Sequence, residues 1–181
     1  MPPKEDGNVA HRFCIAIVQK MSIKHETIPV LVDLNLIDYI IGLIKRSQTK
    51  KIHVFSLDFA TALLANILHA KTTFTYFQQP ANKPKLASYI KDLLSLIKMP
   101  NTLATSVLMH ILISLNYLKK EQFVDIVEDE CHFSDTISEF VDAYSKVITS
   151  EKENDEIDKR TVLDLCAHMF HPKDSSGNDL S

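Results

Sequence analysis

The sequence predicts an all-α fold built from repeated helices, on three observations. Segments 60–68 (ATALLANIL) and 104–112 (ATSVLMHIL) share one apolar pattern 44 residues apart, which indicates a duplicated helix. Gly42 is the only glycine between Asn8 and Ser176, whereas β-turns and phosphate-binding loops depend on glycine. Four prolines stand between apolar segments, where proline tends to start or end a helix: Pro29, Pro80, Pro84 and Pro100. Stacked repeats leave an extended surface free, which suits partner binding better than catalysis.

Apolar residues at helical spacing predict the individual elements. The helices are expected over 9–22, 25–33, 34–46, 54–70, 84–98, 101–117, 119–130, 134–148 and 155–170. Two helices are expected to begin at caps, Asn101-Thr102 and Ser134-Asp135. The helix before each duplicated one also matches, because 40–44 and 93–97 share a pattern 53 residues apart. We therefore expect 1–8 to be flexible, 9–150 to form the helical repeat domain, 151–173 to form an acidic linker and C-terminal helix, and 174–181 to be disordered.

The sequence also predicts where the protein resides. The N-terminus shows no pattern of a secretory signal, and the longest apolar run, 107–115, is far shorter than the roughly 20 residues of a membrane span. Three widely spaced cysteines, Cys14, Cys131 and Cys166, do not suggest a disulfide framework. We expect a cytoplasmic protein with no membrane partner.

Charge is distributed unevenly along the chain. Residues 1–120 hold 15 Lys/Arg and 7 Asp/Glu, whereas residues 121–158 hold 2 and 13. The resulting net charges are +8 and −11, and they would steer partners to opposed surfaces of one molecule. The alternative is that the charged residues only form solvated helix faces. Residues 121–158 are expected to form a terminal acidic cap of two or three helices.

The helix pattern resembles armadillo repeats, whose last helix carries small residues, Leu and Asn; here 36–44 resembles the second helix and 59–68 the third. Three runs extend the match: MSIKH at 21–25, LVDLNLIDYI at 31–40 and LDFATALLANI at 57–67. Over about residues 15–120 the chain is similar to the armadillo region of the LisH-domain ciliary armadillo proteins, although their LisH motif and coiled coil have no counterpart in it. The resemblance implies an armadillo/HEAT-like right-handed α-solenoid.

The same resemblance implies a function. It points to a non-enzymatic scaffold of the cytoskeleton, cilium or basal body, which acts in cilium assembly or stability with microtubule-associated protein partners. One alternative is a general cytosolic adaptor without a ciliary role. Another is a small helical enzyme or metal protein whose site is assembled across helices.

Two groups of residues are candidates for protein binding. Asn66 matches the armadillo asparagine that hydrogen-bonds the main chain of an extended ligand, and His110 occupies the matching position of the next repeat. The alternative for Asn66 is a bridge between neighbouring helices. The second group is a basic cluster in the longer loop between the first helix pair: Lys45, Arg46, Lys50 and Lys51. These side chains would either contact an acidic surface such as a tubulin tail or only complement helix C-termini.

Other site chemistries are not predicted. Cys166, His168 and His171 are three potential metal ligands, but structural zinc sites usually supply four. Adjacent Cys131 and His132 would point to different sides of a helix, so no nucleophile and base pair is expected. The chain is mildly acidic, with a pI near 6.2, and no aromatic residues alternate with the basic cluster, which argues against nucleic acid. We expect no enzyme activity, cofactor or metal.

Overall fold

The computed structural model describes residues 9–49, 52–98, 103–119, 123–148 and 156–170, and every regular element within them is a helix. The all-α prediction is thus confirmed. In chain order the elements are α1 (Val9–Met21), the 3₁₀ turn η1 (His25–Thr27), α2 (Ile28–Asp33), α3 (Leu36–Ser47), α4 (Val54–His69), α5 (Lys71–Gln78), α6 (Lys83–Ile97), α7 (Thr105–Leu118), the π-helix η4 (Ile126–Glu130), α8 (Phe133–Ile148) and α9 (Glu156–Phe170). The predictions for 1–8, 151–155, 174–181 and the cap Asn101-Thr102 fall outside the described residues.

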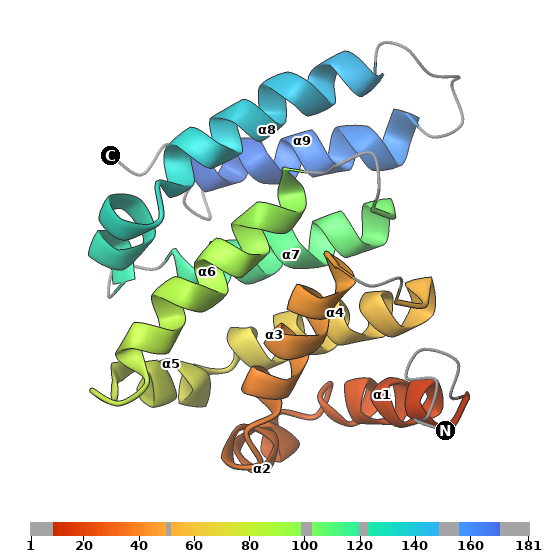
Figure 1. Ribbon diagram of the computed structural model, residues 1–181, viewed down its shortest axis with the longest axis vertical. Coiled ribbons are helices and arrows are strands. Elements are labelled where there is room, and N and C mark those ends of the chain that lie inside the picture. The colour runs from red at the N-terminus through yellow and green to blue at the C-terminus, as the bar shows by residue number, and fades with distance from the viewer. Residues whose placement is uncertain (1–8, 50–51, 99–102, 120–122, 149–155, 171–181) are drawn as a thin grey trace, which may run out of the picture.

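The long helices form two rows (Figure 1). One row, which we call the α4 row, consists of α1, α4, α7 and α9, each packed against the next. The other, the α3 row, consists of α3, α6 and α8, and each of these helices packs on the α4-row helix that follows it in the chain. The short helices α2, α5 and η4 lie where the chain enters each helix of the α3 row, and α2 is at the bottom of the view in Figure 1.

Neighbouring helices within a row run in the same direction. In the α4 row, Arg12 near the start of α1 lies 3.0 Å from the ring of His53, the residue before α4. Beyond the end of α1, Ser22 bonds Asn66 near the end of α4. The rings of His69 and Tyr117 lie side by side at the ends of α4 and α7, with centroids 5.0 Å apart.

The α3 row is joined by polar contacts between α3 and α6. Asp38 accepts hydrogen bonds from Lys85, at 2.8 Å, and from the hydroxyl of Tyr89. Burial opposes ionisation of Asp38, but these two hydrogen bonds and the Lys85 charge outweigh it and lower its pKa. Near the other end of the pair, Lys45 lies 3.4 Å from the carboxylate of Asp92. These contacts fix how α3 lies on α6.

The duplicated helices α4 and α7 supply the centre of the core, as their apolar pattern predicts. Six residues of the shared apolar pattern are exposed by no more than 2%: Leu63, Leu64, Ile67, Val107, Leu108 and Ile111. Both helices are apolar around most of their circumference because other helices cover them on several sides. Alanines and serines at their contacts allow this close packing, as at Ala60 and Ser114, which are 1% and 0% exposed.

Helix α5 was not predicted. Its sequence, KTTFTYFQ, is rich in Thr and aromatic residues, which have low helix propensity, and it shows no 3.6-residue apolar period. Tertiary contacts stabilise it instead: Thr73 donates a 2.6 Å hydrogen bond to the Ile67 carbonyl at the end of α4, and Phe77 is 1% exposed among aromatic rings that include Tyr89 and Phe123.

The segment predicted as one helix over 119–130 also differs. Its last five residues form the π-helix η4, after which His132 adopts a left-handed backbone with φ of 51°. The expected cap Ser134 lies inside α8, and its backbone N–H and hydroxyl donate to the Glu128 carboxylate at 3.1 and 2.9 Å. Glu128 therefore satisfies donors at the start of α8. The order of one short and two long helices thus occurs three times, in α2–α3–α4, α5–α6–α7 and η4–α8–α9.

No single helix among the described residues is long and apolar enough to cross a membrane. The helical segment 25–33 and α3 reach the required length and composition only as a pair, bent by 77°.

Candidate functional site

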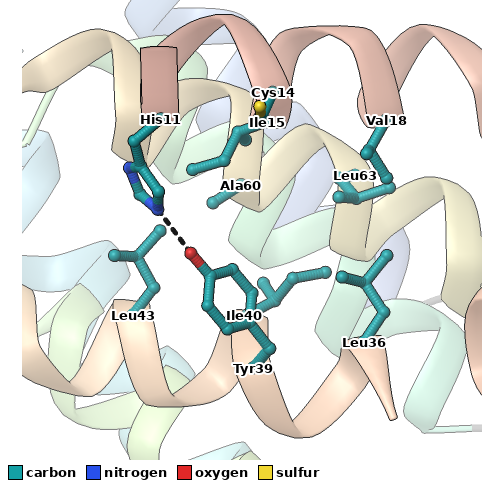
Figure 2. Close-up of a pocket in the computed structure, with 10 residues that line it drawn as sticks. All are labelled: His11, Cys14, Ile15, Val18, Leu36, Tyr39, Ile40, Leu43, Ala60 and Leu63. Carbon is teal, nitrogen blue, oxygen red and sulfur yellow. Dashed lines mark hydrogen bonds between the residues drawn. The ribbon is translucent and has the colours of Figure 1, made fainter. Parts of the chain in front are cut away.

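The described residues line an apolar cavity of about 190 Å³ between α1, α3 and α4, partly open to solvent, which we call the α1–α3 cavity (Figure 2). Ala60 and Leu63 of α4 form its floor. The remaining lining residues come from α1 and α3: His11, Cys14, Ile15, Val18, Leu36, Tyr39, Ile40 and Leu43. An apolar cavity of about 150 Å³ is sufficient to hold a benzene ring. The α1–α3 cavity therefore has room for one large apolar group.

Polar atoms are present only at the border of this cavity. Figure 2 shows the ring of His11 hydrogen-bonded to the hydroxyl of Tyr39, which joins α1 to α3 at one end. Tyr39 is 43% exposed, and Cys14 is also exposed. Hydrocarbon walls of this kind are suited to bind an apolar group.

A second hollow lies on another side of α1. It has a volume of about 500 Å³, is open to solvent, and is lined by Phe13, Ala16, Ile17, Lys20, Met21, Lys24 and Thr27. Phe13 and Ile17 belong to an exposed stripe at a spacing of four residues, the α1 face: Val9, Phe13, Ile17 and Met21 are 52%, 64%, 58% and 46% exposed. Val30 of α2 and Leu34, the residue directly after α2, are exposed as well. Large apolar side chains gathered on one exposed helix face are typical of interaction surfaces.

The α1 face was not among the predicted sites, although the sequence contains a sign of it. Ile15 and Val18 form one apolar side of α1, and Val9, Phe13, Ile17 and Met21 form a second. A helix that is apolar on two sides normally packs against other elements on both. Among the residues that the structure describes, elements cover the Ile15 side and leave the second side exposed.

Asn66 is half-buried on α4 and donates a 2.9 Å hydrogen bond through its amide nitrogen to Ser22 Oγ. Ser22 is 2% exposed, and its hydroxyl in turn donates to the Gln19 carbonyl. This contact is the bridge between neighbouring helices that the sequence left open as the alternative to ligand binding.

His110 is half-buried on α7 and faces α4. Its Nδ1 lies 3.3 Å from Thr61 Oγ1 and 3.7 Å from Asp58 Oδ1, a buried oxygen without a hydrogen-bond partner. Burial lowers the pKa of His110, although the nearby Asp58 carboxylate opposes that shift. Asn66 and His110 do not occupy matching levels: Asn66 contacts Ser22, 44 residues earlier and just beyond α1, whereas His110 lies beside Thr61 of α4, 49 residues earlier. The 44-residue sequence offset is therefore not the spatial register of α4 and α7.

The predicted basic cluster is only partly described. Lys45 and Arg46 lie in the last turn of α3, not in a loop, and both are exposed. Lys45 pairs with Asp92 of α6. Lys50 and Lys51 lie outside the described residues.

The cysteine and histidine candidates do not come together. Cys166 is buried and His168 exposed on α9, and His171 lies outside the described residues. Burial raises the pKa of Cys166 to about 12, so its thiol is protonated and inert. Cys131 is likewise buried, with its pKa raised by burial, and lies 3.6 Å from the Ala87 carbonyl, while His132 is exposed. Within the described part of the chain no three His, Cys, Asp or Glu residues are grouped to hold a metal.

The acidic end of the chain forms the other end of the two rows. Asp135, Glu139 and Asp142 are exposed on α8, the last helix of the α3 row. No large apolar residue of α7, α8 or α9 is exposed where the structure describes the side chains. The two ends of the rows therefore differ in chemistry, one apolar and one acidic.

Comparison with known proteins gives no relative: no family model, no curated protein and no solved structure matches this chain.

Proposed function

We propose that this chain is a non-enzymatic protein-interaction scaffold whose helices form a right-handed solenoid of the armadillo type. Three consecutive units of one short and two long helices support the solenoid, as do rows in which neighbouring helices run in the same direction. Each unit contacts mainly its neighbours, which is the packing logic of repeat proteins.

The exposed α1 face is the observation that carries the proposed binding function. An exposed helix face of a repeat protein is normally polar, whereas gathered apolar side chains are typical of a face that a partner covers. The α8 end follows this rule through Asp135, Glu139 and Asp142, whereas the α1 end presents Phe13 and Ile17. The α1 face is therefore the surface at which a partner adds to the rows of helices.

A ciliary role is supported by the sequence resemblance alone. On that basis the partners are microtubule-associated proteins, the location is the cytoskeleton at the cilium or basal body, and the role is cilium assembly or stability. The α1–α3 cavity agrees with a scaffold because its mostly apolar walls can hold an apolar side chain of a partner.

Proximity labelling in ciliated cells tests this proposal. The wild-type chain is compared with the double variant Phe13→Asp, Ile17→Asp and with Val124→Asp, a matched change at an exposed residue beside η4. We expect basal-body and ciliary proteins to be labelled by the wild type and by Val124→Asp, but not by the double variant. Labelling of cytosolic proteins alone would favour the general adaptor. An identical set for all three chains would remove the α1 face as the binding surface.

A further inference from the structure

We propose that the α1–α3 cavity is the seat of an acidic amphipathic α-helix from a partner protein, which inserts one large apolar side chain into it. This inference rests on the proposed scaffold function and names the chemistry of its partner. The argument uses the internal repetition of the fold, the shape of the cavity and the charges around it.

The internal repetition shows which kind of element fits beside α3. Helices α3 and α6 are equivalent, and their matched positions are buried alike, as at Ile40 and Leu93, which are 1% and 0% exposed. On α6, Tyr89 and Asp92 lie against α3, where they contact Asp38 and Lys45.

The α3 positions equivalent to Tyr89 and Asp92 are Leu36 and Tyr39, and both line the α1–α3 cavity. Beneath α3, Tyr89 is 9% exposed and the side chain of Asp92 is 18% exposed, whereas their equivalents are more open: Leu36 is half-buried and Tyr39 is 43% exposed. The side of α3 that faces the cavity thus repeats the side of α6 that a helix covers. A helix lying on α3 as α3 lies on α6 would cover Leu36 and Tyr39.

The shape of the cavity favours a helix over a flat surface. It is bounded by α1 on one side, α3 on the other and Ala60 below, so its occupant must present a narrow, convex apolar ridge. At about 190 Å³ it can hold one aromatic or long aliphatic side chain. Enclosed pockets filled by one such side chain commonly provide most of the affinity of an interface.

The charges around the cavity favour an acidic partner. Helix α1 contains no Asp or Glu; of its two cations, Arg12 contacts His53 and Lys20 lies on the side of α1 that lines the second hollow. On α3, Arg46 is exposed one turn beyond Leu43 and on the same side of the helix as Tyr39. A partner helix with carboxylates beside its apolar anchor would complement these cations.

A second copy of this chain lacks the required combination. Its acidic α8 supplies Asp135, Glu139 and Asp142, but the described side chains of α8 and its neighbours α7 and α9 include no exposed large apolar residue that could fill the cavity. Contact between two α1 ends would oppose cationic helices that lack carboxylates. Neither arrangement matches both the apolar walls and the charge.

Selection from a phage-displayed library of helical peptides against the full chain tests the proposal. We expect the enriched peptides to have an apolar ridge with one Phe, Leu or Met anchor and flanking Glu or Asp. Fluorescence anisotropy measures the affinity of each variant for a selected peptide. Ala60→Met fills the cavity from its floor and is expected to lower that affinity at least about tenfold, and Arg46→Glu is expected to lower it several-fold. Ala62→Met, the same change at a residue of α4 that does not line the cavity, should leave binding unchanged.

A second readout needs no variant. Cys14 lines the cavity and is exposed, whereas Cys131 and Cys166 are buried. A bound peptide should therefore slow alkylation of Cys14 by iodoacetamide.

Several results would overturn the inference. The inference fails if the selection enriches no peptide, if it enriches basic peptides, or if a bound peptide does not slow alkylation of Cys14. It also fails if the chain binds anionic phosphatidylserine vesicles instead of peptides. Dimerisation that Ala60→Met abolishes would assign the cavity to a second copy. If Ala60→Met leaves the affinity for selected peptides unchanged but Phe13→Asp lowers it, the α1 face remains the scaffold surface and only the assignment of the cavity fails.

Discussion

Asn66 on α4 donates a 2.9 Å hydrogen bond to Ser22, which lies just beyond the end of α1 and is 2% exposed. The two residues are 44 apart in sequence, and their contact fixes the ends of two neighbouring helices of the α4 row at the same level. The amide that resembles a ligand-binding asparagine is thus part of the contact between α1 and α4.

This contact predicts the effect of changing Asn66. Asn66→Ala should lower the free energy of unfolding by about 1 kcal/mol, because the Ser22 hydroxyl loses a donor. Ser22→Ala should have a similar effect, and the double variant should be less destabilised than the sum of the two singles. Urea denaturation of the four proteins measures this. Unchanged stability of Asn66→Ala together with lost partner binding would instead assign Asn66 to the ligand.

The duplicated core predicts a larger effect at Leu64. Leu64 is 1% exposed, so Leu64→Ala removes buried methyl groups and leaves a void, which should lower the free energy of unfolding by about 2–5 kcal/mol. Leu34→Ala is the matched control, because Leu34 is 71% exposed. A loss below about 0.5 kcal/mol at Leu64 would lie outside the range for a buried leucine and would contradict the described packing of α4.

His110 predicts a pH dependence of stability. Burial holds its pKa below the ordinary 6.5 in the folded chain, so the unfolded chain binds the proton more readily. The stabilising contribution of neutral His110 is complete above about pH 6.5 and is lost as the pH falls through the folded pKa. His110→Gln, which does not titrate, should therefore lose less stability between about pH 7 and pH 5 than the wild type. Equal losses in thermal unfolding experiments would show that His110 titrates normally.

The basic cluster predicts a separation of stability from binding. Replacing Lys45, Arg46, Lys50 and Lys51 with Ser should change the free energy of unfolding by less than about 1 kcal/mol, because the Lys45–Asp92 pair is solvent-exposed on the lysine side. If the cluster contacts an acidic surface, affinity for a partner should fall and depend less on salt. Binding titrations at two ionic strengths measure this, and unchanged affinity would leave the cluster with no part in recognition.

Most helices could be predicted from sequence because their apolar spacing is local information. The pattern of α4 and α7 gives both their helical state and the burial of Leu64 and Ile111. Helix α5 could not be predicted, because Thr73 and Phe77 are held by residues from other elements.

The sites depend on contacts between distant segments and were harder to predict. The role of Asn66 depends on Ser22, and the position of His110 depends on the register of α7 on α4, which the sequence repeat does not determine. The α1–α3 cavity requires three helices to be placed before any of its lining residues can be recognised.

Hydrogen–deuterium exchange of the chain, free and bound to a partner recovered by labelling, tests the central claim most directly, because it locates the covered surface without any substitution. The account predicts slower amide exchange in α1 and α3, which border the α1 face and the cavity, and unchanged exchange in α8. Protection confined to α8, or to α7 around His110, would contradict it.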